Sequence, residues 1–129
     1  MPYVAALDMT DLQFGRNVWQ ALRSQQKFVW NAVFWLRDPD GEQWNLVIVT
    51  PLLDREGPRQ AYMLLSEITR GVGSPGDQLL RITLMSPKEP LFVSLHSVFA
   101  KTASVEGVRL NNTYVGNVVV PEAYLYEVR

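Results

Sequence analysis

The segment from Phe28 to Thr50 constrains the fold most, because it holds two long apolar runs around a short polar stretch. It reads FVWNAVFWLRDPDGEQWNLVIVT. In the polar stretch, Asp38-Pro39-Asp40-Gly41 supplies a proline with a fixed negative φ, an aspartate that can bond its own backbone, and a glycine that accepts a positive φ. This pattern predicts a β-hairpin whose three-residue loop is Pro39–Gly41.

A three-residue loop also predicts the register of the hairpin, since it places Asp38 opposite Glu42. Leu36 then faces Trp44, and Trp35 faces Asn45. One face is apolar throughout and is expected to be core: Trp30, Ala32, Phe34, Leu36, Trp44, Leu46 and Ile48. The other face carries polar interruptions: Asn31, Val33, Trp35, Arg37, Asn45, Val47 and Val49. We expect this second face either to lie under a helix or to be a contact surface, with Trp35, Arg37 and Asn45 as interface candidates.

Length and composition indicate a single globular domain over residues 1–129, since 47% of the residues are hydrophobic. The formal net charge of −1 gives no electrostatic basis for binding nucleic acid or an anionic membrane surface. The absence of cysteine excludes disulfides and thiol chemistry and suits a reducing cytoplasm. We also find no signal-peptide pattern and no window as long as a membrane span. The expectation is therefore a cytoplasmic protein with neither membrane nor nucleic-acid partners.

Three helices are predicted from their start signals. Thr10 and Gln13 match a capping box, which predicts a helix from there to about Ser24. Pro58 fits the first turn of a second helix, which Gly71 is placed to end. The segment 86–89, Ser-Pro-Lys-Glu, matches another capping box and predicts a third helix, with its proline at the first helical position and its end near residue 100.

The strand patterns complete a mixed order of elements. They are Leu79–Met85, Val108–Leu110, Thr113–Val115, Val118–Val120 and Ala123–Val128. This order predicts an α+β (mixed α/β) fold, a single sheet built on the hairpin with about three helices packed on it. The chain is expected to return through the second helix to a strand parallel to the second hairpin strand. The C-terminal strand is expected to pair within the sheet, with Tyr124, Tyr126 and Val128 on one side and Leu125 on the other.

Several short motifs resemble a group of short, uncharacterised bacterial proteins. The resemblance rests on Trp35, Trp44, the run Leu46–Pro51, the segment Gly57-Pro58-Arg59 through Tyr62, and the ending Glu122–Tyr126. It covers about half of the chain. The group has no established activity, so the resemblance implies a bacterial source, with a possible origin on a mobile element, and no reaction.

Candidate catalytic groups are few. His96 is the only histidine, and its neighbours Ser94 and Ser97 diverge from it around a helix, so they do not form a nucleophile–base pair. The densest acidic set, Asp38, Asp40 and Glu42, is better explained by turn chemistry than by a calcium loop. No phosphate-binding glycine motif occurs. We therefore expect no metal, no cofactor and no catalytic residue, and an enzyme is disfavoured.

The start of the second helix is the one predicted ligand site. It follows a strand end, where open α/β sheets place ligand crevices, and its free N–H groups favour an anion. Arg55 and Arg59 flank this point, and Tyr62 adds a hydroxyl about one turn further on. The structural alternative pairs both arginines on the surface and buries Tyr62 in the core.

Two function hypotheses remain open. The first is a small non-catalytic interaction module, expected to form homo-oligomers or to bind a protein partner through the half-polar sheet face or a sheet edge. The second is a small ligand-binding protein or enzyme that uses the anion site of Arg55, Arg59 and Tyr62. The state of the second sheet face separates them: covered within one chain, packed on another chain, or open as a pocket.

Overall fold

The computed structural model describes residues 7–37, 43–72, 81–102 and 104–129. The elements are α1 (Met9–Arg23), β1 (Ala32–Arg37), β2 (Trp44–Val49), α2 (Leu52–Thr69), β3 (Ile82–Met85), α3 (Pro90–Phe99), β4 (Arg109–Leu110), β5 (Thr113–Val115), β6 (Val118–Val120) and β7 (Ala123–Val128). A five-stranded sheet has the order β3-β2-β1-β7-β4, and β5 and β6 form a separate hairpin. The predicted α+β class is confirmed, and the separate small sheet is an addition to it.

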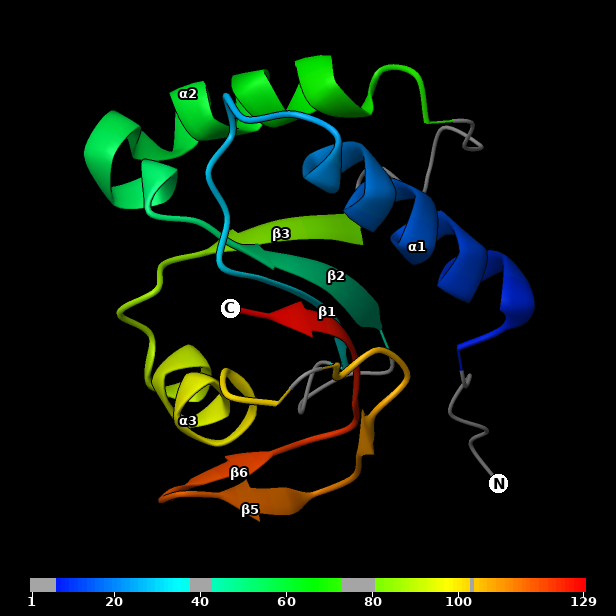
Figure 1. The fold of residues 1–129 in the computed structure, drawn as a ribbon, viewed down its shortest axis with the longest axis vertical. Coiled ribbons are helices and arrows are strands. Elements are labelled where there is room, and N and C mark those ends of the chain that lie inside the picture. Colours follow the sequence, from blue (N-terminus) through cyan, green and yellow to red (C-terminus); the bar gives the residue numbers. More distant parts are fainter. Residues whose placement is uncertain (1–6, 38–42, 73–80, 103) are drawn as a thin grey trace.

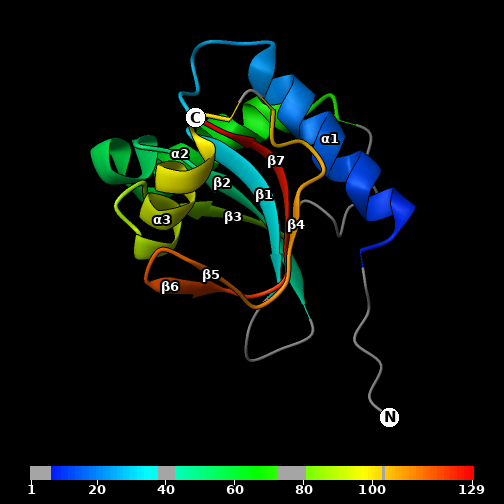
Figure 2. The same ribbon diagram turned by 60° about the horizontal axis from the view of Figure 1, so that its bottom comes forward.

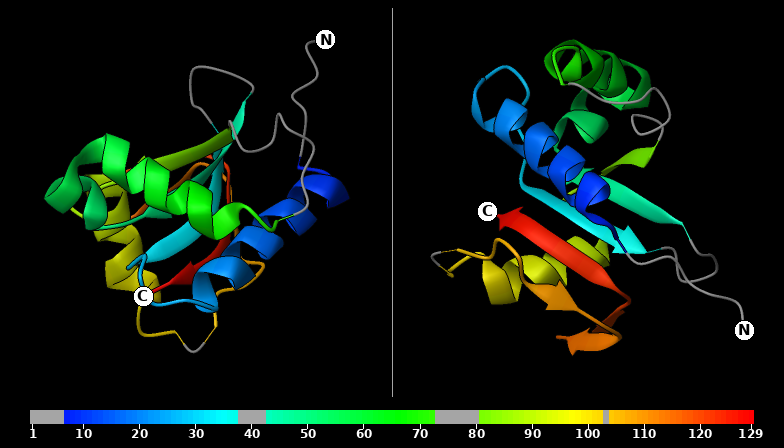
Figure 3. Two further views of the ribbon diagram at one scale, coloured as in Figure 1. Left: turned by 90° about the horizontal axis from the view of Figure 1, so that it is seen from above. Right: turned by 90° about the vertical axis from the view of Figure 1, so that its right-hand side faces the viewer.

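Both faces of the large sheet are covered within the chain. Helices α1 and α2 lie on one face, and α3 with the β5–β6 hairpin lies on the other (Figures 1 and 3). The β2 and β3 strands pair in parallel through α2, as predicted, whereas the other neighbours in the sheet are antiparallel. Two hydrophobic cores result, one on each face. The half-polar face of the hairpin is therefore interior, and the sheet offers no open face to a partner.

The hairpin register differs from the prediction by one residue. Trp35 lies opposite Leu46, and Leu36 opposite Asn45. Arg37 lies opposite Trp44, and the predicted turn Pro39–Gly41 lies outside the described residues. Because side chains alternate, the shift puts Trp35 and Trp44 in one core, beneath α1 and α2. The sequence pattern did not reveal this because both faces are mostly apolar, so hydrophobicity alone does not select a register.

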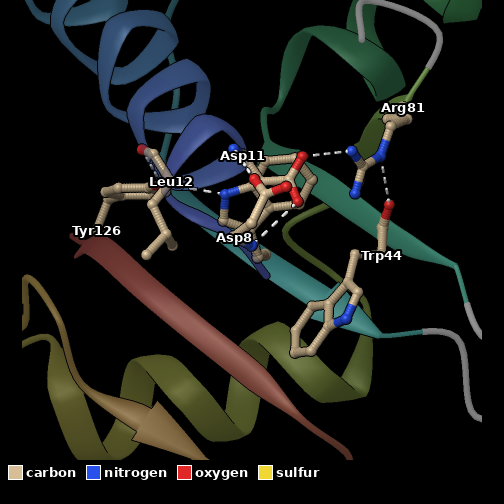
Figure 4. Close-up of polar contacts among 7 residues, drawn as sticks. Asp8, Asp11, Leu12, Trp44, Arg81 and Tyr126 are labelled. Carbon is tan, nitrogen blue, oxygen red and sulfur yellow. Dashed lines mark hydrogen bonds and ion pairs between the residues drawn. The ribbon is translucent and has the colours of Figure 1, made fainter. Parts of the chain in front are cut away.

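The start of α1 also differs from the prediction. Asp8, not Thr10, is the N-cap. Its carboxylate accepts from the Asp11 N–H at 2.8 Å, and the Asp11 carboxylate accepts from the Asp8 N–H. The Asp11 carboxylate also accepts a hydrogen bond from the Arg81 guanidinium at 2.7 Å, and Arg81 Nε donates to the Trp44 carbonyl (Figure 4). The acidic cap is thus favoured because it serves both the helix end and a cation at the start of β3.

The starts of α2 and α3 also differ from those predicted from the proline positions. Helix α2 begins at Leu52, six residues before the predicted start, but Gly57 interrupts it with φ 84° and ψ 162°. Pro58 then opens the second helical segment, as expected. For α3, the first-position proline is Pro90 and not Pro87. The Ser86 hydroxyl does not cap the helix; it accepts from the Lys88 N–H and donates to the Asp54 carboxylate.

Strand β7 is central to the sheet, which confirms that the C-terminal strand is paired. It lies between β1 and β4, and four of its side chains are buried. Helix α1 crosses it closely at Gly15, which lies against Tyr126 and Trp35. The Trp35 indole N–H donates to the Tyr126 hydroxyl at 3.0 Å, and that hydroxyl donates to the Leu12 carbonyl at 2.7 Å. This buried chain of hydrogen bonds joins α1, β1 and β7.

The observed register changes the expected ranking of two tryptophan substitutions. From the sequence, Trp44→Ala costs more than Trp35→Ala. In the structure Trp35 is fully buried and hydrogen-bonded, and Trp44 is 6% exposed. We expect each substitution to lower the free energy of unfolding by about 3–5 kcal/mol, with Trp35→Ala at the upper end. Urea unfolding of both variants checks this, and a loss below about 1 kcal/mol for Trp35→Ala would contradict the register.

Candidate ligand groove at the end of β7

An irregularity in β7 sets the geometry of the candidate site. The pairing of β1 with β7 shifts between Val33 opposite Glu127 and Phe34 opposite Leu125, which leaves Tyr126 as the extra residue of a β-bulge. The bulge directs both Tyr126 and Glu127 toward α1, whereas Val128 joins the opposite core. The predicted alternation is therefore right for Tyr124, Tyr126 and Leu125 and wrong for Val128, which lies on the Leu125 side.

A groove of about 460 Å³ lies beside this bulge. Its walls come from the second half of α1, the end of β7, and the segment that joins α3 to β4. Figure 2 shows residues 104–108 running alongside α1, with the C-terminal end of β7 between α1 and α3. The polar and aromatic residues that line it are Trp19, Arg23, Thr102, Ser104, Glu106, Tyr126, Glu127 and Arg129. It combines charged, hydroxyl and aromatic groups in one place.

The Glu127 carboxylate is held on both oxygens. Its Oε1 accepts from the Trp19 indole N–H at 2.8 Å, and its Oε2 accepts from Arg129 Nε at 2.9 Å. Arg129 in turn stacks over the Trp30 ring, with its guanidinium carbon 3.6 Å from the ring centroid. Since two rigid indoles fix this pair, Glu127 has a defined position at the groove and its charge is balanced by Arg129.

Of the two other charged residues that line the groove, Glu106 has an ion-pair partner and Arg23 has none among the described residues. Glu106 forms an ion pair with Arg16 of α1. Arg23, in the last turn of α1, lies over the Trp19 ring at 5.2 Å from its centroid. Among the described residues Arg23 has no carboxylate partner within ion-pair distance. The groove therefore has one positive charge that no lining residue neutralises.

The floor of the groove contains the Tyr126 ring, whose hydroxyl is committed to the interior. Burial raises the pKa of this phenol far above its usual value, and the hydrogen bond from Trp35 only partly opposes that effect. The hydroxyl stays protonated in the folded protein across the physiological range. It acts as a structural link between helix and sheet, since its donor and acceptor capacities are both used.

The raised pKa predicts alkaline unfolding. In the unfolded chain Tyr126 ionises near pH 10, whereas in the fold it stays neutral. Its contribution to stability is therefore complete below about pH 10 and declines as the pH rises above that value. Ultraviolet titration is expected to show a tyrosine that ionises only as the protein unfolds. Tyr126→Phe should remove that delayed ionisation, and an unchanged delayed step in this variant would contradict the assignment.

The three residues of the predicted anion site at the second helix are placed in different surroundings. Arg55 and Arg59 are exposed on either side of Gly57, and within the described residues no hydrogen bond or ion pair engages the side chain of either one. The Tyr62 hydroxyl is occupied, because it accepts from the Leu84 N–H of the edge strand β3 at 2.9 Å. This bond covers part of an otherwise open sheet edge. Tyr62 thus serves the sheet, and the two arginines remain surface residues.

The predicted interface residues are also placed differently from expectation. Trp35 is fully buried under α1 and has no surface with which to meet a partner. Arg37 pairs with Glu122 at 2.8 Å, and Asn45 is partly buried opposite Leu36. The exposed His96 packs its ring on Phe92, which agrees with a surface histidine.

Sequence reasoning missed the groove because its residues come from three separate segments. Trp19 and Arg23 lie on α1, Glu106 precedes β4, and Glu127 ends β7. The one local signal was a carboxylate, Glu127, in an apolar strand. The bulge that turns it toward α1 has no glycine or proline to mark it.

Comparisons with known proteins give no assignment for this site. No family model, curated protein or solved structure matches the chain. Among the described residues, no group of three or more histidine, cysteine or acidic side chains is arranged to hold a metal ion. No helix in the described part of the chain has the length and apolar character to cross a membrane. The groove itself is thus the basis for any functional proposal.

Proposed function

We propose that this protein is a small, non-catalytic binding module that takes a small organic anion in the groove beside the β7 bulge. The observation that carries the proposal is Arg23, a guanidinium at the groove with no carboxylate partner among the described residues. Arginine matches a carboxylate or phosphate in geometry, and the Trp19 ring beneath it limits its conformations.

The charge balance of the groove supports a ligand that presents one anionic group to Arg23. Glu127 is compensated by Arg129, and Glu106 by Arg16, so Arg23 supplies the remaining charge. Hydroxyl groups of Thr102 and Ser104 add neutral hydrogen-bond partners at the same wall. Two charge-assisted hydrogen bonds contribute about 3–6 kcal/mol, which corresponds, before the entropic cost of association, to a dissociation constant between about 6 mM and about 40 μM.

A non-catalytic role is supported by how the candidate acid–base groups are used. The Tyr126 hydroxyl donates and accepts within the fold, and the Glu127 carboxylate forms an ion pair with Arg129. The phenol is therefore not free to exchange a proton with a ligand, and the paired carboxylate serves as a fixed negative charge. The groove therefore favours binding over proton transfer.

The test is a thermal-shift and calorimetric titration with sodium propionate and sodium phosphate, against sodium chloride at equal ionic strength. The wild-type protein is expected to bind propionate, and the stability gain follows the logarithm of ligand concentration. Arg23→Gln should weaken that affinity roughly tenfold, since it removes the charged donor. Glu106→Gln should strengthen it, because Arg16 would then add an unbalanced positive charge.

Arg59→Gln is the matched control, since it removes an exposed arginine from the helix start that the sequence singles out as an anion site. It is expected to leave propionate and phosphate affinity unchanged. If Arg59→Gln abolishes binding and Arg23→Gln does not, the anion site lies at the second helix and the groove proposal fails. Absence of anion binding in the wild-type protein would reject both sites.

We also propose self-association, a cytoplasmic location and a bacterial mobile-element origin. Self-association is supported by Tyr114 and Val119, which lie directly opposite each other on β5 and β6 and are 76% and 45% exposed. The cytoplasmic location rests on the absence of cysteine, and the bacterial origin on the motif resemblance. The molar mass of the full chain by light scattering tests the first: a monomer at all concentrations contradicts it.

A further inference from the structure

We infer that the anion taken by the groove is the carboxylate of a free amino acid, whose ammonium group is bound by Glu127. This inference rests on the proposed function and specifies its ligand class. It follows from the position of a fixed carboxylate next to the unneutralised Arg23. Both groups contact the same indole: Arg23 lies over the Trp19 ring, and Glu127 accepts from the Trp19 N–H.

The shared indole limits the separation of the two charges. Glu127 Oε1 is 2.8 Å from Trp19 Nε1, and the Arg23 guanidinium carbon is 5.2 Å from the centroid of the same ring. The Arg23 guanidinium and the Glu127 carboxylate are therefore separated by no more than the width of the Trp19 ring plus one contact distance on each side. In an α-amino acid the carboxylate and ammonium groups are separated by a single carbon atom. A ligand of this kind can reach both side chains at once.

Glu127 retains the capacity for a further donor. A carboxylate has about four lone-pair positions, and the structure uses one on each oxygen, for Trp19 and Arg129. Its side chain is 28% exposed, so the remaining positions are accessible. Glu106 is the weaker choice because its partner Arg16 is 45% exposed, whereas Trp19 and the stacked Arg129 hold Glu127 in place.

The groove also has room for more than the charged groups. Its volume of about 460 Å³ exceeds that of a carboxylate and an ammonium, and its loop wall carries Thr102 and Ser104. These hydroxyls suit a side chain that is neutral and polar. The ligand class is therefore a free amino acid whose side chain is uncharged, so that its only charged groups are the carboxylate and the ammonium.

The test compares each amino acid with its deaminated analogue by calorimetry on the full chain. Serine is paired with 3-hydroxypropanoate, asparagine with succinamate, and leucine with 4-methylpentanoate. In the wild-type protein we expect the best of the three amino acids to bind roughly tenfold tighter than its analogue, because the ammonium group adds a charge-assisted hydrogen bond. Amides of the same amino acids, which lack the carboxylate, should bind more weakly than the amino acids.

The decisive variant is Glu127→Gln, which keeps an acceptor for the Trp19 N–H but removes the negative charge. It is expected to abolish the preference for the amino acid and to raise the affinity for the analogue, since Arg129 loses its partner. Arg59→Gln is the control: it removes an exposed arginine that does not line the groove, so it should leave the affinities for amino acid and analogue, and their ratio, unchanged.

The outcomes separate the inference from the function on which it rests. If the analogues bind through Arg23 with the same affinity as the amino acids, the groove is an anion site and the amino-acid inference is wrong. If the preference survives in Glu127→Gln, the ammonium site lies elsewhere and the inference is also wrong. If neither set binds to the wild-type protein, the proposed function itself fails.

Discussion

Gly15→Ala is expected to destabilise the protein by about 3 kcal/mol or more, despite the higher helix propensity of alanine. A Cβ at position 15 would lie 2.3 Å from the Tyr126 hydroxyl oxygen and 2.6 Å from Trp35 Nε1. Neither atom can move freely, because each belongs to the buried hydrogen-bond chain between Trp35, Tyr126 and Leu12. Relief of the clash therefore breaks those bonds or lifts α1 from the sheet. Chemical denaturation measures the loss.

Gly71→Ala is the matched control for this substitution. Gly71 follows α2, has no positive φ, and an added Cβ would meet nothing within 4 Å. Its replacement should change stability by less than about 1 kcal/mol. Tyr126→Phe in the Gly15→Ala background should recover part of the loss, since the closest atom is removed. Equal, small effects of Gly15→Ala and Gly71→Ala would show that α1 does not approach β7 this closely.

Deletion of the chain after Pro121 is expected to abolish cooperative folding. It removes β7 from between β1 and β4, together with the buried Leu125, Tyr126 and Val128. The sheet would be split, and both cores would lose side chains. Each large buried apolar side chain contributes about 1.5–3 kcal/mol, against a typical total stability of about 5–15 kcal/mol. Circular dichroism during heating should therefore show no cooperative transition.

The control for this deletion is Tyr114→Ser in the full-length chain. Tyr114 precedes β7 in the same C-terminal region but is 76% exposed on the small hairpin. Its replacement should leave the thermal transition almost unchanged. A truncated chain that keeps a cooperative transition would mean that β7 is dispensable, in contradiction to its place in the sheet.

The element order was predictable because each helix and strand has a local signature. Two long apolar runs predicted β1 and β2, and alternating residues predicted β7. The proline at position 58 predicted a helix start that does occur after Gly57. The helix caps were less predictable, since Asp8 and Thr10 are both good N-caps and only the tertiary contact of Asp11 with Arg81 distinguishes them.

The register and the site were not predictable for a common reason: both depend on contacts between distant segments. A hairpin with two apolar faces fits either register until α1 covers one face and α3 the other. Glu127 and Arg23 are far apart in sequence and meet through Trp19 only because the β7 bulge turns Glu127 toward α1. The predicted anion site relied on local features alone, and the fold leaves Arg55 and Arg59 exposed while the Tyr62 hydroxyl bonds to β3.

The most direct measurement of the central claim is the Trp19 indole N–H resonance during a propionate titration at constant ionic strength. The chain has four tryptophans, so a Trp19→Phe variant assigns the resonance. This N–H donates to Glu127, and its ring lies beneath Arg23, so an anion bound in the groove must perturb it. We predict a saturable shift of the Trp19 resonance that is larger than that of any other indole and is lost in Arg23→Gln. An unmoved Trp19 resonance, or an equal shift in Arg23→Gln, would contradict the account.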